Sequence, residues 1–208
     1  MSWSGSEQGE SPIGARGRIL PAQLAWYVTG RFYVDGDGAI LDAGYFLHLQ
    51  DVTGTLFLGA PGEGTACFTF LAEPFNADRL TNGDLSLAVD AVGEFSLFLN
   101  RDPGGPTFDD PRSFGAGERI ATFRRTSIVV GSTVGGVDGA PAVVSVNLFS
   151  AALVESKEFE HGGRTLDLGR LLPNGITQWG TASTKSISPL PAGYTAAVPF
   201  VGSAVAIG

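Results

Sequence analysis

Hydrophobic and polar residues alternate along residues 24–49 in two runs, and a four-residue segment of turn formers, residues 35–38 (DGDG), separates them. A doubled Asp-Gly between β-branched and aromatic runs is the strongest short-range signal for a β-hairpin. A turn with an even number of residues places Arg31 opposite Asp42. One face of this ribbon is then almost wholly apolar: Trp26, Val28, Gly30, Phe32, Leu41, Ala43, Tyr45 and Leu47.

Similar patterns continue to the end of the chain and predict about ten strands with short, antiparallel connections. The further strands are expected at residues 55–58, 65–71, 84–90, 94–100, 118–132, 140–155, 176–183 and 194–207. Three hairpins are expected among them. Residues 55–58 would pair with 65–71, residues 84–90 with 94–100, and residues 118–132 with 140–155. A single helical turn is expected at 168–172.

Residues 101–117 (RDPGGPTFDDPRSFGAG) interrupt this pattern, because their prolines exclude the interior of a strand or helix. A segment of this length in a compact domain is either a functional lid or binding loop, or a disordered excursion.

The fold class that follows is all-β, with a flexible arm at residues 1–19 and a single domain at residues 20–208. Closure into an antiparallel barrel of about 8–10 strands removes the exposed edges of such a sheet, so we expect a barrel. A β-sandwich is the alternative.

The composition limits the classes of molecule to which the protein is expected to bind. Charged residues make up only 16% of the chain, and the net charge of -8 would repel a nucleic-acid backbone and an anionic membrane surface. No apolar run reaches the roughly 18 residues that span a bilayer. Cys67 has no second cysteine to pair with, and the first residues lack the apolar segment of a signal peptide, so a cytoplasmic location is expected.

Neither a metal nor another cofactor is expected. His48 and His161 are the only histidines, which excludes a three-histidine zinc site. The DGDG segment resembles the start of a calcium loop, but Ala39 and Ile40 follow where a ligand and a glycine are required. The hairpin turn explains the segment better.

The turns and strands of the first hundred residues resemble those of the allene oxide cyclase and lipocalin-like β-barrels. The residues that carry the resemblance are 30–34 (GRFYV), the Asp37-Gly38 turn, Gly44, residues 64–70 and residues 82–85 (NGDL). The resemblance implies a barrel with an apolar lumen that binds a small lipophilic molecule, or that cyclises or isomerises a reactive one. No catalytic motif of these proteins is matched, so no functional residue is transferred.

The mixed face of the first hairpin supplies the candidate catalytic residues: Tyr27, Arg31, Asp42 and His48. Tyr27 and His48 would exchange protons and Arg31 would stabilise an oxyanion. The same residues could equally be an ordinary solvated strand face with a cross-strand ion pair. The candidate ligand-binding residues are Trp26, Tyr45, Phe68, Phe70, Arg125 and Asn147. Arg125 is included because Arg124 and Arg125 alternate along one strand, so that one of them should point inward.

The expected function is binding of a small hydrophobic molecule in the lumen, with cofactor-independent cyclase, isomerase or lyase chemistry on it. A ligand-binding protein without catalysis is one alternative. The second alternative is a structural or assembly β-sandwich that forms a homo-oligomer through an apolar face, which the Ala- and Val-rich strand at 195–207 favours.

Overall fold

The structure is a computed structural model and describes residues 17–74, 78–82, 85–90, 93–126, 129–134, 143–183 and 185–208. The strands are β1 (Leu24–Asp35), β2 (Ile40–Leu49), β3 (Phe68–Ala72), β4 (Asp78–Asn82), β5 (Leu85–Asp90), β6 (Glu94–Leu99), β7 (Glu118–Arg125), β8 (Val129–Val134), β9 (Val143–Ser156), β10 (Phe159–His161), β11 (Arg164–Leu166), β12 (Ile176–Ala182) and β13 (Tyr194–Ala206). The 1–16 part of the expected arm lies outside the described residues.

Among the described residues, helical structure consists of three short pieces: the 3₁₀ helices η1 (Glu63–Thr65) and η2 (Pro111–Gly115) and the single turn α1 (Leu168–Leu171). The turn predicted at 168–172 is therefore confirmed. Within the described ranges, no helix has the length and apolar character needed to cross a membrane.

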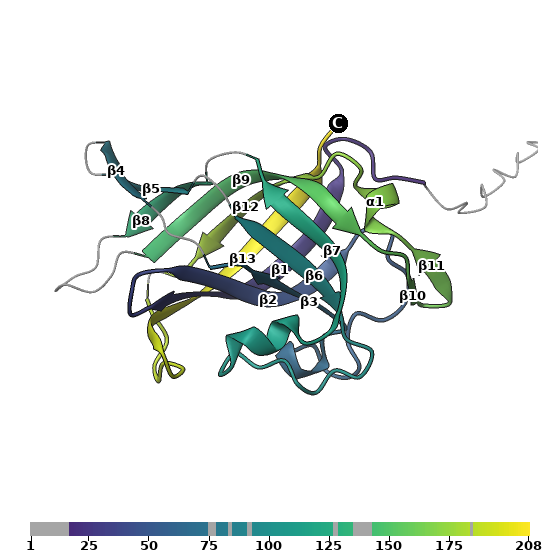
Figure 1. Ribbon diagram of the computed structural model, residues 1–208, viewed down its shortest axis with the longest axis horizontal. Helices are drawn as coiled ribbons and strands as arrows, with labels where there is room; N and C mark the ends of the chain where they lie inside the picture. Colours follow the sequence, from purple (N-terminus) through teal and green to yellow (C-terminus); the bar gives the residue numbers. More distant parts are fainter. Residues whose placement is uncertain are drawn as a thin grey trace, which may run out of the picture.

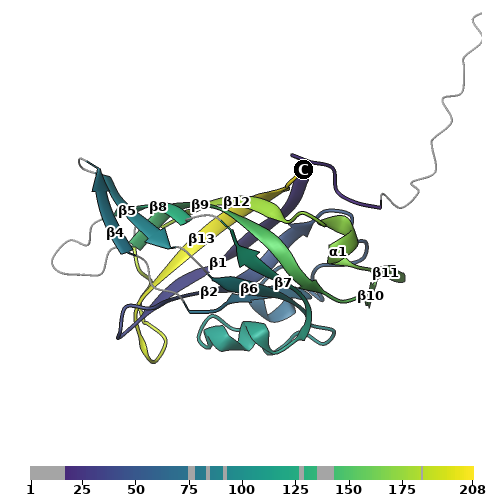
Figure 2. The same cartoon turned by 45° about the horizontal axis from the view of Figure 1, so that its top comes forward.

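Eight strands close into an antiparallel barrel in the order β12-β13-β1-β2-β3-β6-β7-β9, because β9 also pairs with β12 (Figure 1). The predicted barrel is confirmed, and the sandwich alternative is wrong. The long strand β9 can belong both to the barrel and to the sheet beyond it, because β7 and β8 pair with different parts of the same edge. Its residues 143–148 pair with β8 and its residues 151–156 pair with β7. Strands β8, β5 and β4 therefore continue the sheet away from the barrel, as Figure 2 shows.

Several of the expected pairings are wrong, since strands adjacent in sequence were assumed to pair. Strand β5 pairs with β4 and β8, whereas β6 pairs with β3 and β7, so residues 84–100 form no hairpin. The expected pairing of residues 55–58 with 65–71 is present but short: it consists of the antiparallel Phe57–Ala66 bridge, with hydrogen bonds from Leu58 N to Thr65 O and from Cys67 N to Leu56 O. The single strand expected at 118–132 is two strands, β7 and β8. The hairpin of β8 with β9 is confirmed.

The β1–β2 hairpin forms as predicted, but its register is shifted by one residue. The Asp35 backbone N–H donates to the Ala39 carbonyl at 3.0 Å, which leaves a three-residue loop, and Gly38 adopts the left-handed conformation at φ 85°. This odd loop length is typical of a turn followed by a left-handed glycine. It pairs Phe32 with Asp42 and Arg31 with Ala43. The predicted Arg31–Asp42 pair is therefore wrong, as is the predicted face membership of β2.

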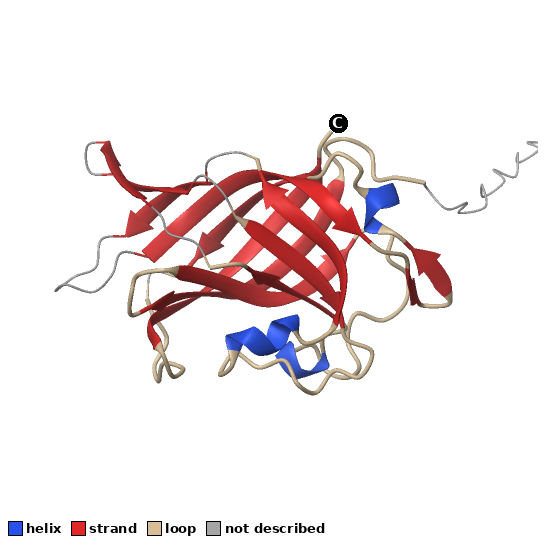
Figure 3. Ribbon diagram, in the orientation of Figure 1, coloured by secondary structure: helices blue, strands red, loops and turns tan. Residues whose placement is uncertain are grey.

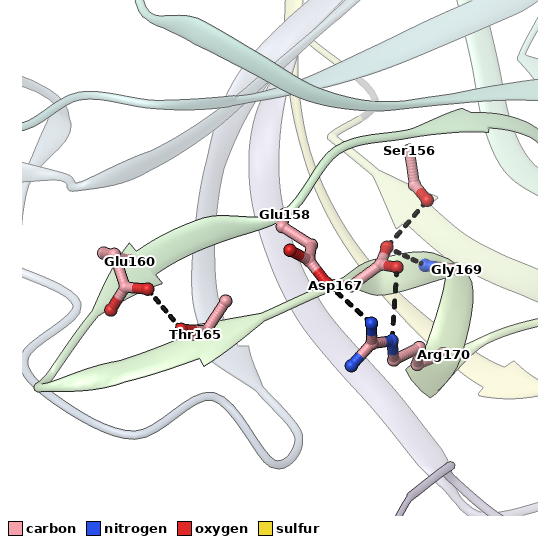
Figure 4. Close-up of polar contacts among 7 residues, drawn as sticks. All are labelled: Ser156, Glu158, Glu160, Thr165, Asp167, Gly169 and Arg170. Atoms are coloured by element: carbon pink, nitrogen blue, oxygen red, sulfur yellow. Dashed lines mark hydrogen bonds and ion pairs between the residues drawn. The ribbon is translucent and has the colours of Figure 1, made fainter.

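The segment between β9 and β12 packs across one end of the barrel. Asp167 caps α1: its carboxylate accepts a hydrogen bond from Gly169 N at 2.8 Å and another from the Ser156 hydroxyl at 2.7 Å (Figure 4). Arg170 forms an ion pair with Glu158 at 2.6 Å on the outside of this turn. The apolar side chains of the segment belong to the barrel core: Phe159, Leu166, Leu168, Leu171 and Leu172. The barrel is therefore plugged at this end.

Residues 101–117 are ordered and cover the outer face of the barrel, below the strands in Figure 3. Phe114 is fully buried in a second apolar cluster with Tyr33, Leu41 and Ala43. Thr69 donates a hydrogen bond to the Phe114 carbonyl at 2.7 Å, and Tyr33 donates one to the Phe108 carbonyl at 3.0 Å. The segment is thus fastened to the outside of β1, β2 and β3.

Burial in this second cluster raises the pKa of the Tyr33 hydroxyl well above its ordinary value of 10.0. Since the unfolded chain then loses this proton at lower pH than the folded protein, the stabilisation is complete below about pH 10 and is lost as the pH rises beyond it. We expect the free energy of unfolding, measured with urea at about pH 8 and pH 11, to fall less steeply with pH in Tyr33→Phe. An unchanged slope in that variant would show that Tyr33 does not contribute.

Candidate functional site

The lumen of the barrel is filled mainly by aromatic rings. The rings of Phe32 and Phe200 stack at 4.4 Å between centroids, and those of Phe95 and Phe123 stack at 5.3 Å. The Trp26 ring meets Phe46 edge to face at 5.6 Å. Such pairs add about 0.5–1.5 kcal/mol each beyond the area they bury, so the lumen is a packed core over most of its length.

Two glycines make room for these rings. Gly30 and Gly44 lie opposite each other on β1 and β2, and a Cβ atom on Gly44 would lie 2.9 Å from the Phe70 ring and 2.1 Å from the Thr29 carbonyl oxygen. A side chain at either position would therefore displace both a strand and a lumen ring.

An ion pair crosses this aromatic interior. Asp42 comes from β2 and Arg125 from β7, and the carboxylate oxygen Oδ2 lies 3.6 Å from the guanidinium nitrogen Nη2. The Asp42 side chain is 10% exposed and the Arg125 side chain 2%. The guanidinium carbon also lies 5.2 Å from the centre of the Phe149 ring. Burial of two charges is expensive even when they are paired, so this pair is not explained by stability alone.

Two amides add to the polar interior. Trp26 Nε1 donates a hydrogen bond to Gln178 Oε1 at 3.0 Å, which joins β1 to β12. Asn147 on β9 is 5% exposed, and no described residue provides a hydrogen-bond partner for its Oδ1 atom. Gly180 faces Asn147 across the β9–β12 pair, and a Cβ atom there would lie 3.1 Å from that oxygen. A buried amide oxygen without a partner costs free energy unless a bound molecule satisfies it.

A small cavity lies beside Asp42 and Gln178, with a volume of about 10 Å³. Its walls are Trp26, Val28, Asp42, Phe46, Phe70, Phe95, Phe149 and Gln178. This volume is about that needed to hold one water molecule. A larger guest would enter only if aromatic side chains rotated away.

We call the lumen end near the β1–β2 loop the open end, because the segment that contains α1 plugs the other end. Phe32, Asp42 and Phe95 near this end are each 7% exposed, whereas Trp26 and Phe68 are 1% exposed. The other end is plugged by α1 and its flanking segments. A molecule entering the lumen would therefore pass Asp42 first.

Three hollows formed by described residues on the outer surface are larger, with volumes of about 320, 300 and 230 Å³. Their walls include exposed side chains that form surface ion pairs, such as Arg101 with Glu118 and Arg119 with Glu155. Such pairs are ordinary features of a protein surface and contribute little. The lumen is the better candidate site, because its polar groups are buried.

The structure separates the four candidate catalytic residues. Asp42 lies in the lumen, but Tyr27, Arg31 and His48 lie on the outer face of the barrel. The Tyr27 and His48 rings lie 6.1 Å apart at the surface, and Arg31 stacks over the Phe108 ring at 4.2 Å. The one-residue shift of the β1–β2 register causes this separation, since it moves Asp42 to the opposite face from Arg31.

The candidate ligand-binding residues divide differently. Trp26 and Phe70 line the cavity, and Arg125 and Asn147 are buried in the lumen. The alternation of Arg124 and Arg125 is confirmed, because Arg124 is exposed and pairs with Glu94 at the surface. Phe68 packs at the plugged end, where its ring contacts Phe159.

Tyr45 is the exception, because it lies outside the lumen. It packs under the segment at 101–117, where its ring lies 6.1 Å from that of Phe108.

Five residues of the cavity wall are not among the predicted site residues: Val28, Phe46, Phe95, Phe149 and Gln178. The pattern of β9 could have indicated Phe149, because it is two residues from Asn147 and therefore on the same face. Gln178 had no such signal, since a glutamine in a strand is as common on the outside of a barrel.

No three His, Cys, Asp or Glu side chains lie close enough together to hold a metal ion in the part of the chain that the structure describes. Cys67 is buried, and burial raises the pKa of its thiol. A protonated, buried thiol is a poor nucleophile, so Cys67 is a core residue.

The barrel has the lipocalin-like architecture of eight antiparallel strands around a lumen. Comparisons with protein-family models, with curated proteins and with solved structures found no match. The buried polar groups at the open end of the lumen are therefore the basis for inferring a function.

Proposed function

We propose that the protein binds a small hydrophobic molecule carrying a polar group at the open end of the barrel lumen. The observation that carries this proposal is the Asp42–Arg125 ion pair, which is buried among aromatic rings beside a cavity. Apolar residues of similar volume would fill the same space at equal or lower cost. A pocket with apolar walls and a few buried polar groups is the usual form of a small-molecule site.

The polar group of the ligand would meet the lumen amides. Asn147 Oδ1 would accept a hydrogen bond from a hydroxyl or N–H group, and the aromatic walls would enclose the rest of the molecule. Since the cavity holds about 10 Å³, binding requires Phe32 or Phe95 at the open end to change rotamer. The expected ligand is therefore compact and mostly apolar.

Phenol and toluene test this arrangement, because they have nearly the same shape and differ in one hydroxyl group. We expect both to bind saturably, and Asn147→Leu to weaken phenol alone, by about three- to ten-fold, the value of one hydrogen bond. The fluorescence of Trp26 reports binding, since its ring lines the cavity, provided Trp3 and Trp179 are replaced by Phe. Ser203→Ala on the outer face of β13 is the control and should change neither affinity.

Native mass spectrometry of the protein as purified from cells tests the same proposal without a chosen ligand. A co-purifying molecule in the native spectrum, absent after denaturation, would give the mass of the ligand. An apo spectrum together with no saturable binding of either probe would contradict the proposal.

The buried guanidinium of Arg125 favours a second candidate function in the same lumen: cofactor-free cyclisation or isomerisation, as in the allene oxide cyclase barrels that the sequence resembles. Arg125 would stabilise negative charge as it develops on a carbonyl oxygen, and Asp42 would orient the guanidinium. With a ligand identified, Arg125→Lys separates the two functions. A catalytic role predicts a lower kcat at similar affinity, because the ammonium lacks the planar fork of the guanidinium. If the protein is only a carrier, neither the wild-type chain nor Arg125→Lys forms a product.

A further inference from the structure

Four adjacent barrel strands share a region of their outer face that is uncharged and partly apolar, bordered by Arg31 of β1 and Glu155 of β9. Strands β9, β12, β13 and β1 are neighbours in the sheet. Five large apolar side chains on them are between 45% and 51% exposed: Tyr27, Val146, Leu148, Trp179 and Val201. The outward positions between them carry Thr29, Ser150, Thr177, Thr181, Pro199, Ser203 and Val205. We call these twelve residues the uncharged outer face.

The pairing of the strands makes this face continuous. Trp179 on β12 lies opposite Leu148 on β9 and opposite Ser203 on β13. Ser203 in turn lies opposite Tyr27 on β1. Trp179 is therefore near the centre of the face, between Leu148 on one side and Ser203 on the other.

Charge distinguishes this face from the rest of the barrel wall. Strands β12 and β13 contain no charged residue, although the chain has a net charge of -8. On the wall beyond it, β6 and β7 carry the surface ion pair of Glu94 with Arg124, and Arg119 of β7 pairs with Glu155 near the far end of β9. Two copies of this acidic chain would repel each other most weakly where neither presents a charge.

We infer that the uncharged outer face binds the same face of a second copy, in a two-fold symmetric dimer. A charged partner would leave its own ions buried against a surface that offers no counter-ion, at a high desolvation cost. A second copy presents the same uncharged sheet, and two sheets pack face to face at about 10 Å. A two-fold axis through Trp179 would place this side chain at the centre of the interface, where tryptophan contributes most.

The size of the face agrees with a dimer of modest affinity. Four strands span about 19 Å and seven residues span about 23 Å, so two faces in contact cover roughly 900 Å² in flat projection. Side-chain relief raises the accessible area toward about 1,200 Å², the lower limit for a specific interface. We therefore expect the dimer to dissociate on dilution.

Sedimentation equilibrium of the full chain, over a wide concentration range into the high micromolar, tests this inference. We expect a monomer–dimer equilibrium whose dissociation constant rises by at least about 30-fold in Trp179→Lys, and similarly in Val201→Glu. Leu58→Lys is the matched control, because Leu58 is 54% exposed but lies outside this face. It should leave the equilibrium unchanged. Near-ultraviolet circular dichroism of each variant shows whether the barrel remains folded.

Three outcomes would overturn the inference: a monomer at every concentration, a dimer that Trp179→Lys and Val201→Glu leave intact, or a dimer that Leu58→Lys weakens equally. Binding of the protein to vesicles of neutral phosphatidylcholine is measured as a further test. If they bind the wild-type chain and not Trp179→Lys while the protein in solution stays monomeric, the face binds lipid and the dimer is excluded.

Discussion

Replacing Arg125 with Met is expected to lower the free energy of unfolding by about 3–5 kcal/mol, the usual cost of removing one member of a buried ion pair. The variant leaves the Asp42 carboxylate inside an aromatic lumen without its counter-ion, which lies 3.6 Å away in the folded protein. Urea denaturation at neutral pH measures the effect.

Arg124→Met is the matched control for this prediction. Arg124 precedes Arg125 on β7, but its side chain is 57% exposed, and its ion pair with Glu94 is at the surface. Because water screens exposed pairs, this substitution should change the stability by about 0–1 kcal/mol. Equal losses in the two variants would show that the lumen pair is not desolvated.

The double variant Asp42→Leu with Arg125→Met separates the cost of burial from the contribution of the pair. Removing both members also removes the buried charge that each single variant leaves behind, so we expect the double variant to be more stable than either single variant. The coupling energy follows from the double-mutant cycle. If ligand affinity falls in this variant while stability recovers, the pair serves binding, as the proposed function requires.

Replacing Trp26 with Ala is the second substitution from which a large effect is expected, a loss of about 3–5 kcal/mol. Trp26 is 1% exposed, and its ring meets both Phe46 and Phe123 edge to face at 5.6 Å. Truncation would leave a large cavity in the lumen and an unpaired Gln178 Oε1. The midpoint of urea denaturation, with the slope unchanged, measures the loss.

Trp179→Ala is the control for this substitution, since it removes the same side chain from a position that is 45% exposed. At concentrations below the dimerisation range, it should change the stability by no more than about 0.5 kcal/mol. Trp26→Phe then separates the contribution of ring packing from that of the hydrogen bond, because phenylalanine keeps an aromatic ring but cannot donate to Gln178. A loss in Trp26→Ala as small as in Trp179→Ala would contradict the packed lumen.

For the hairpin at residues 24–49, local sequence patterns predict the turn and the strands but not the register. The DGDG segment and the flanking alternation predict the turn and both strands, and the structure confirms them. The register failed because it depends on whether Gly38 takes the left-handed conformation, which adds one residue to the loop. In a strand of period two, one residue exchanges the faces, and with them the expected partner of Arg31.

The polar pair in the lumen could not be predicted from the sequence. Asp42 and Arg125 lie on β2 and β7, with β3 and β6 between them in the sheet. They approach each other only because the sheet curves and closes, which depends on β9 pairing with β12. The alternation of Arg124 and Arg125 required one of them to point inward, but did not identify its partner.

Local patterns gave a second kind of wrong prediction at residues 84–100 and 118–132. Each stretch was expected to remain together in one hairpin or one strand, and each divides between the barrel and its extension. Strand β9 is long enough to pair with both β7 and β8 on one edge, and this competition between distant strands is invisible in a local window.

The sequence by itself determined the all-β class, the first hairpin, the final two strands and the inward position of one of Arg124 and Arg125, and it favoured a barrel over a sandwich. These features follow from alternation and turn chemistry, which act over a few residues. Only the tertiary structure decided the hairpin register, the pairing of β5 and β6, the outer position of the 101–117 segment and the meeting of Asp42 with Arg125. Each of these depends on contacts between strands far apart in the chain, and their free energies are set by closure of the barrel rather than by neighbouring residues.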